Sequence, residues 1–177
     1  MILRGISDLV LIRHGESIRN ISECKGSFYQ NDADRETVGV LQDRLIPLTE
    51  KGRQQAIAAG LGLKDNFGIP DTVIHSGFMR TQQTAKGILQ AYSKDEFARI
   101  EIEENHLIRE RNPGCLMNWT EAEVNERLPW WNDYWRTADK FSVVPFGGES
   151  IAAMIEGRLM FFMKSLEKTS FKKGGNP

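Results

Sequence analysis

The chain has few of the residues and runs that mark several protein classes. Only two of its 177 residues are cysteines, Cys24 and Cys115, and they lie far apart with no CxxC motif. This spacing argues against a thiolate metal site and favours ordinary reduced thiols. No apolar run approaches the ~18–20 residues that cross a bilayer, and residues 1–7 hold no signal-peptide core. These absences predict a cytoplasmic protein with no membrane segment.

An excess of charge of either sign is also lacking. The chain carries 23 Lys and Arg against 24 Asp and Glu, a net charge of −1. Nothing in this balance favours a nucleic-acid or membrane-surface partner. No metal-ligand spacing occurs, so no metal is expected. With 40% apolar residues, the length suits one domain over residues 1–177 with a core of its own.

Short apolar runs alternate with amphipathic stretches along the chain. A continuous apolar run over 9–12, a second over 71–76 and an alternating stretch over 98–104 predict strands. Helices are predicted after the N-caps Thr49, Thr120 and Ser150, and over residues 80–92. Thr120 also forms a capping-box pattern with Glu123. The order of strands and helices predicts an α/β domain with a mostly parallel sheet.

Two segments interrupt this alternation. Residues 22–46 are polar and irregular, and predict a long excursion over the surface. Residues 171–177, FKKGGNP, have the composition of a turn.

Arginines follow two of the predicted strands. Arg13 and His14 come directly after the run 9–12, and Arg80 follows the strand 71–76 at the start of a helix. The carboxyl ends of parallel strands are where ligands gather. A guanidinium fork fits phosphate oxygens, and a neutral imidazole can act as nucleophile or base. The arrangement favours phosphate handling, although a simple surface Arg-His turn remains open.

Four motifs in this order resemble the histidine phosphatase superfamily, in its phosphoglycerate-mutase-like group. They are LIRHGESIRN, SGFMRTQQTA, IRERNPG and GGES. The resemblance extends from residue 9 to residue 150. It implies a three-layer α/β fold in which helices flank a mostly parallel central sheet.

The resemblance implies a role for several residues of these motifs. His14 would attack the phosphoryl group and form a phosphohistidine. It must attack as a neutral imidazole, and the flanking arginines disfavour its protonation. Arg13 and Arg80 would clamp the phosphate, and the amide of Asn20 would contact it. The same phosphate-binding loop contains Gly15, Glu16 and Ser17.

Glu110, in the third motif, matches the proton donor of the family. It would protonate the leaving oxygen and then deprotonate the attacking water. This role requires a protonated carboxyl near neutral pH, so we expect burial to raise the pKa of Glu110.

One part of the family pattern is missing. A second histidine in a late apolar strand is expected, but the three histidines are His14, His75 and His106, and the latter two favour structural roles. The favoured expectation is a chain that is C-terminally incomplete. The alternative is a natural chain with impaired catalysis. An open sheet edge could pair with a second copy, so a homodimer is possible.

The predicted function is phosphomonoester hydrolysis without a metal or cofactor. The partner would be a small phosphorylated substrate or inorganic phosphate. Mutase-type phosphoryl transfer and a catalytically impaired phospho-ligand-binding module remain as alternatives.

The segment 111–148 is expected to form a cap or insert. It holds all four tryptophans, which predict either a substrate lid or, preferably, a satellite core. Glu149 stands at the predicted start of a helix, so a role in capping that helix is preferred over a role in lining the site.

Overall fold

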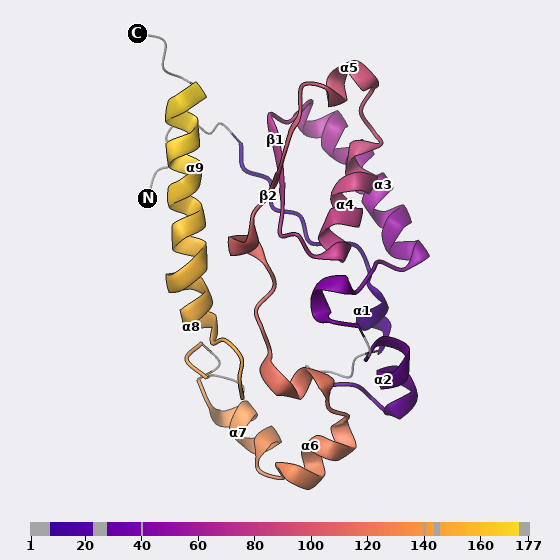
Figure 1. Cartoon of the computed structure of the whole chain (residues 1–177), viewed down its shortest axis with the longest axis vertical. Coiled ribbons are helices and arrows are strands. Elements are labelled where there is room, and N and C mark those ends of the chain that lie inside the picture. Colours follow the sequence, from indigo (N-terminus) through magenta and orange to yellow (C-terminus); the bar gives the residue numbers. More distant parts are fainter. Residues whose placement is uncertain (1–7, 23–27, 40, 140, 144–145, 174–177) are drawn as a thin grey trace.

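The computed structural model describes residues 8–22, 28–39, 41–139, 141–143 and 146–173. Short helices and a small sheet follow one another along the chain (Figure 1). The described part also has 3₁₀ turns at Asp43–Leu45, His106–Ile108 and Gly114–Asn118. The helices and strands are α1 Ile18–Ser22, α2 Asp32–Val38, α3 Glu50–Phe67, β1 Thr72–His75, α4 Met79–Leu89, α5 Lys94–Phe97, β2 Glu101–Glu104, α6 Glu121–Arg127, α7 Trp131–Thr137, α8 Ile151–Ala153 and α9 Met160–Lys173.

β1 and β2 form a parallel pair in which Thr72 lies opposite Glu101 and His75 opposite Glu104. Both strands were predicted, and β-branched residues make up most of β1. Helices α3 and α4 pack against each other beside this pair (Figure 1). Together they bury a core that includes Ile88, Tyr92 and Ile100, with Val73 of β1 packed against it. This core fixes the start of α4, where Arg80 lies.

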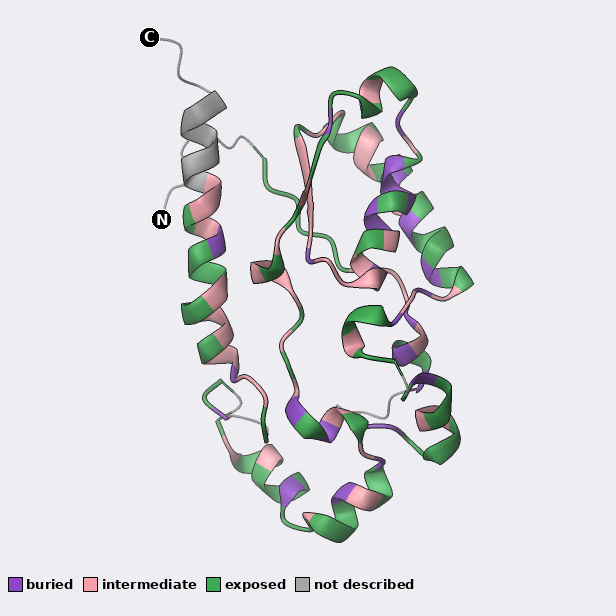
Figure 2. Ribbon diagram, in the orientation of Figure 1, coloured by how far each residue is buried: buried purple, intermediate pink, exposed green. Residues whose placement is uncertain are grey.

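The predicted strand over residues 9–12 is wrong. These residues have no strand pairing, and Figure 2 shows this segment in the colour of exposed residues. The side chain of Leu11 is 83% exposed. A β-strand needs a neighbour for its backbone hydrogen bonds, and no described residue pairs with this segment. The three-layer fold was predicted to have a mostly parallel central sheet. Because residues 9–12 do not pair, the described residues form a sheet of only two strands, β1 and β2.

The described residues of the segment 22–46 are more ordered than the sequence predicted. It contains α2, which Asn31 caps by accepting a hydrogen bond from the Asp34 N–H. Tyr29, Val38 and Ile46 form a small buried core there. The prediction failed because these apolar residues are too far apart in the sequence to form a periodic pattern.

The predicted turn over residues 171–177 is wrong in its first part. Helix α9 continues to Lys173, and residues 174–177 lie outside the described residues. Phe and Lys are acceptable in a helix, whereas the Gly-Gly-Asn-Pro sequence that breaks one comes later.

The aromatic segment folds as a satellite core. Trp131 packs with Phe28, Leu116 and Val124, all of them buried. The remaining members, packed against this core and only partly buried, are Trp119, Leu128 and Trp135. The predicted capping box opens α6, with both hydrogen bonds between Thr120 and Glu123 present. The preferred interpretation of the tryptophans as packing residues agrees with this arrangement.

The predicted helix after Ser150 begins where expected, since Ser150 Oγ accepts a hydrogen bond from the Ala153 N–H. A π-helical turn, Met154–Leu159, separates α8 from α9. No described helix combines the length and hydropathy of a membrane span. Cys115 is a free, exposed thiol, and Cys24 lies outside the described residues.

Candidate active site

The turn after residue 12 is held against two helices. The Gly15 N–H donates to Thr84 Oγ1 of α4 at 3.2 Å. On the other side the turn lies against α3, so closely that a Cβ on Gly15 would lie 2.3 Å from the Gly52 carbonyl oxygen. A side chain at Gly15 would separate the turn from α3. The position of His14 is therefore set by the packing of α3 on α4.

His14 is half-buried, and its ring has a defined tautomer. Nδ1 lies 2.7 Å from the Gly15 carbonyl oxygen. A carbonyl can only accept, so Nδ1 carries the hydrogen and Nε2 keeps its lone pair. Burial lowers the pKa of His14 below its ordinary value of 6.5, and the charges of Arg80 and Arg13 lower it further. The Gly15 carbonyl and Glu110 act in the opposite direction without reversing the shift.

Ser17 and Asn20 form a closed pair at the start of α1. The Ser17 N–H and its Oγ both donate to Asn20 Oδ1 at 2.9 Å. Because the amide oxygen is used in this way, the Asn20 NH₂ group is the part left to donate to an anion.

Arg80 is buried, and its guanidinium is held by Asp43. Arg80 Nη1 donates to the Asp43 carbonyl oxygen at 2.8 Å and to Oδ1 at 3.0 Å, and Nη2 lies 3.5 Å from Oδ2. The guanidinium also lies over the Phe78 ring, 4.8 Å from its centroid. These contacts hold the cation in one orientation, and they bring a carboxylate to the same place.

Six of the predicted site residues surround one cavity of about 170 Å³: Arg13, His14, Ser17, Asn20, Arg80 and Glu110. The cavity wall holds four arginines against two carboxylates, and so favours an anion. Three further charged residues line it that the sequence did not single out, Arg19, Asp43 and Arg111. Arg19 and Arg111 adjoin Asn20 and Glu110 in the motifs. Asp43 has no such local signal.

The expectation of a buried Glu110 is wrong for this structure. Its side chain is exposed at the rim of the cavity, with Oε1 accepting from the Arg111 N–H at 3.1 Å. The described residues leave that side open to solvent.

Gly15 and Glu16 were predicted to lie in the binding loop, but they are not among the described residues that line the cavity. Glu16 instead accepts from Thr49 Oγ1 and from Lys51 Nζ at the start of α3, each at 2.9 Å. The hydrogen bond from Lys51 is the main cause that lowers the pKa of Glu16. Glu16 therefore fixes the loop to α3. Glu149 also lies outside the cavity wall.

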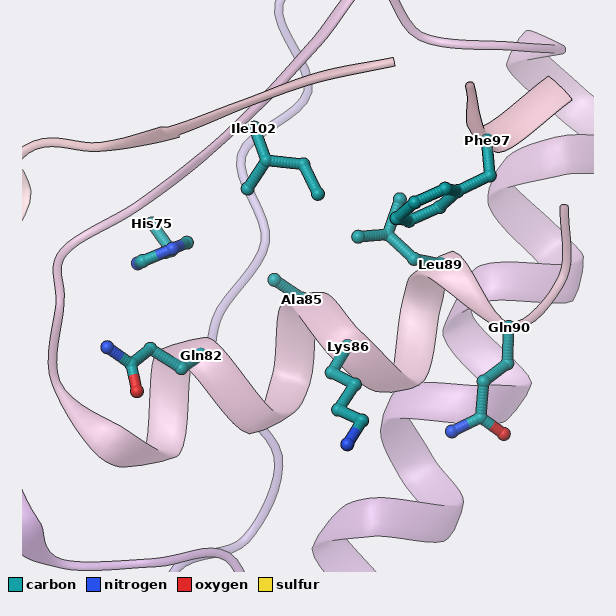
Figure 3. Close-up of a pocket in the computed structure, with 8 residues that line it drawn as sticks. All are labelled: His75, Gln82, Ala85, Lys86, Leu89, Gln90, Phe97 and Ile102. Atoms are coloured by element: carbon teal, nitrogen blue, oxygen red, sulfur yellow. The ribbon is translucent and has the colours of Figure 1, made fainter. Parts of the chain in front are cut away.

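His75 lines a different cavity of about 370 Å³ between α4 and β2 (Figure 3). Figure 3 shows Gln82 and Ala85 on α4, with Ile102 and Phe97 on the other side. His75 Nδ1 accepts a hydrogen bond from the Gly77 N–H at 3.1 Å, and His106 is exposed beside Glu104. Among the described residues of this wall only Lys86 carries a full charge. The cavity around His14, although smaller, has four arginines and is therefore the better candidate for phosphate chemistry.

The sequence over residues 9–173 matches the family model described as the histidine phosphatase superfamily, branch 1. This chain belongs to that superfamily. The resemblance of the four motifs is thereby confirmed.

The curated relatives of this chain include phosphoglycerate mutases. A 2,3-bisphosphoglycerate-dependent phosphoglycerate mutase of Bartonella tribocorum is 31% identical over 147 residues, which cover 81% of this chain and 60% of the mutase. The chain thus spans 60% of the length of that curated relative.

Solved structures of the superfamily share the fold. A mycobacterial glucosyl-3-phosphoglycerate phosphatase with inorganic phosphate has a TM-score of 0.62 and 22% identity, covering 92% of this chain and 64% of that one. An alpha-ribazole phosphatase of Shigella flexneri has a TM-score of 0.64 and 22% identity, covering 89% and 66%. The described chain therefore has the phosphoglycerate-mutase-like fold.

Proposed function

We propose that this protein hydrolyses phosphomonoesters through a phosphohistidine on His14. The observation that carries the proposal is the tautomer of His14. Its Nδ1–H donates to the Gly15 carbonyl, which leaves the Nε2 lone pair for attack, in a cavity lined by arginines. The lowered pKa of His14 keeps that lone pair free of a proton near neutral pH.

In the first step Nε2 of His14 bonds to phosphorus, and the bond from phosphorus to the leaving oxygen breaks. Glu110, protonated at this stage, gives its proton to that oxygen. The Gly15 carbonyl stabilises the positive charge that develops on the ring. Arg13 and Arg80 stabilise the charge on the phosphoryl oxygens.

In the second step a water oxygen attacks phosphorus and the bond to Nε2 breaks, so that the electron pair returns to the ring. Glu110, now a carboxylate, takes the proton of that water. Asn20 donates from its NH₂ group to the phosphate, and Ser17 holds its amide oxygen. General acid–base catalysis of this kind contributes roughly 10²–10⁴-fold in rate.

A mutase reaction is the second candidate. It is favoured by the 31% identity to a phosphoglycerate mutase. In that case the phosphoryl group on His14 passes to a second hydroxyl of the substrate, and a diphosphorylated primer is needed to load the histidine. The same residues serve both reactions, and what differs is whether water or the substrate takes the phosphoryl group.

The test is phosphate release from 4-nitrophenyl phosphate by the 177-residue chain. We expect turnover that falls to the level of the blank in His14→Ala, while the exposed His106→Ala keeps the rate. Conversion of 3-phosphoglycerate to 2-phosphoglycerate only with 2,3-bisphosphoglycerate would support the mutase instead. Vanadate binding by a folded chain without turnover would overturn both reactions and favour a phospho-ligand-binding module.

A further inference from the structure

Glu149 and Arg158 hold the segment that carries Glu110 by hydrogen bonds. Glu149 Oε1 accepts from Arg109 Nη2 at 2.8 Å, and Oε2 accepts from Arg158 Nη2 at 3.1 Å and from the Asn112 N–H at 3.0 Å. We call Arg109, Glu149 and Arg158 the Glu149 clasp. One carboxylate thus binds the segment on both sides of Glu110.

The side chain of Arg158 also binds the backbone of the same segment. Its Nη1 donates to the carbonyl oxygens of Leu107 at 3.1 Å and Arg109 at 2.9 Å. The residue lies in the π-helical turn between α8 and α9, an irregularity that in helices often accompanies functional positions. Its side chain is 12% exposed, and its Nε is buried with no hydrogen-bond partner among the described residues. Leaving this polar atom unpaired is unfavourable, and the hydrogen bonds of Nη1 to the segment and of Nη2 to Glu149 offset that cost.

Backbone contacts complete the attachment. The Glu149 N–H donates to the Asn112 carbonyl oxygen at 2.8 Å. Gly148 approaches the same carbonyl so closely that a Cβ there would lie 2.6 Å from its oxygen. Residues 107–112 are therefore held by side chains and by main chain together.

Glu110 lies between two arginines that both bind Glu149. Arg109 binds the carboxylate, and Arg111 Nη1 donates to the Glu149 carbonyl oxygen at 2.9 Å. Among the described residues, the three hydrogen bonds of the Glu149 carboxylate go to Arg109, Asn112 and Arg158. The clasp binds the neighbours of Glu110, while Glu110 itself lines the cavity.

We propose that Glu149 and Arg158 are positioning residues that hold Glu110 for proton transfer to the leaving group. The proposal rests on the proposed function of Glu110. A general acid works only within hydrogen-bond reach of the leaving oxygen, and displacement by about 1 Å can cost roughly 10²-fold in rate. Because Glu110 is exposed, its position depends on the hydrogen bonds that hold its neighbours Arg109, Arg111 and Asn112.

The first experiment measures amide hydrogen exchange over residues 107–112. Glu149→Ala should raise exchange in this segment at least tenfold while α3 stays protected. Unchanged exchange there would overturn the proposal, and this readout needs no turnover.

The second experiment compares two leaving groups. In Glu149→Ala and Arg158→Lys, kcat for an alkyl phosphate should fall about 10–100-fold with KM nearly unchanged. For 2,4-dinitrophenyl phosphate, whose leaving group needs no proton, kcat should fall less than about threefold. Glu149→Gln keeps an acceptor for one arginine and should give an intermediate loss.

Glu123→Ala is the matched control. Glu123 also accepts from an arginine, Arg35, and from a backbone N–H, that of Thr120, and its exposure is similar. These hydrogen bonds join α6 to α2 and to its own N-cap, and not to the segment that carries Glu110. Equal losses for both leaving groups in Glu149→Ala would show a merely structural role. If Glu110→Gln itself shows no leaving-group dependence, the proposed role of Glu110 fails instead.

Discussion

At the scale of single residues, the site depends on opposing charges placed close together. His14 is kept neutral first by burial and then by Arg80 and Arg13, against the pull of Glu110. Asp43 orients Arg80 and also brings negative charge to the place where a phosphate would bind. In the proposed function the arginines would act on both the nucleophile and the phosphate, because the charge that attracts an anion also disfavours a proton on the imidazole.

The ring of His14 should titrate below pH 6.5. A proton NMR titration, with the signal assigned by its loss in His14→Gln, measures the midpoint, and Arg80→Met should raise it by removing a nearby cation. As the pH falls below 6.5, the unfolded chain takes up this proton before the folded chain does, so the free energy of unfolding decreases across that window. A midpoint above 6.5 would contradict the proposed neutral nucleophile.

At the scale of elements, the close packing of α3 on α4 positions the site. Gly60 of α3 lies against the backbone of α4, where a Cβ would lie 2.4 Å from the Ile88 carbonyl oxygen. Two residues further along the same helix, Gly62 has nothing within 4 Å of the corresponding point. Both glycines weaken α3 as a helix, but only Gly60 has a packing reason to be there.

Gly60→Ala and Gly62→Ala should therefore change stability in opposite directions. Replacing a helical glycine by alanine gains up to ~1 kcal/mol in propensity. Forcing a methyl group into a packed contact costs ~1–3 kcal/mol. We expect Gly62→Ala to raise the free energy of unfolding and Gly60→Ala to lower it. Urea unfolding of both variants measures this, and a stabilised Gly60→Ala would contradict the packing described here.

At the scale of the whole molecule, the described chain has separate cores. One joins α3, α4 and β1, and another holds the tryptophan segment together around Trp131 and Leu116. Arg35 links α2 to this second region, since it pairs with Glu123 of α6. The proposed cap at 111–148 therefore packs as a unit together with Phe28.

Neighbouring tryptophans test whether this unit is a core. Trp131 is 5% exposed and Trp130 is 49% exposed. Trp131→Ala should lower the free energy of unfolding by about 3–5 kcal/mol, whereas Trp130→Ala should cost only about 1 kcal/mol because it loses mainly aromatic edge contacts. Chemical denaturation followed by circular dichroism compares them. If both variants lose the same small amount of unfolding free energy, the alternative of a substrate lid would be favoured instead.

The sequence by itself determined the features that depend on neighbours in the chain. The N-caps Thr49, Thr120 and Ser150 and the strands β1 and β2 were predicted correctly, because capping and β propensity act within a few residues. The motifs also identified the family correctly, since their residue types and order could be compared directly.

Only the tertiary structure decided the features that depend on contacts between distant residues. It left residues 9–12 without a strand partner, buried Tyr29 and Val38 in a segment that looked polar, and exposed Glu110. It also brought Asp43 to Arg80 and Glu149 to Arg109. These pairs are 37 and 40 residues apart, and contacts at such separations follow from the packing of whole elements, which no local pattern records.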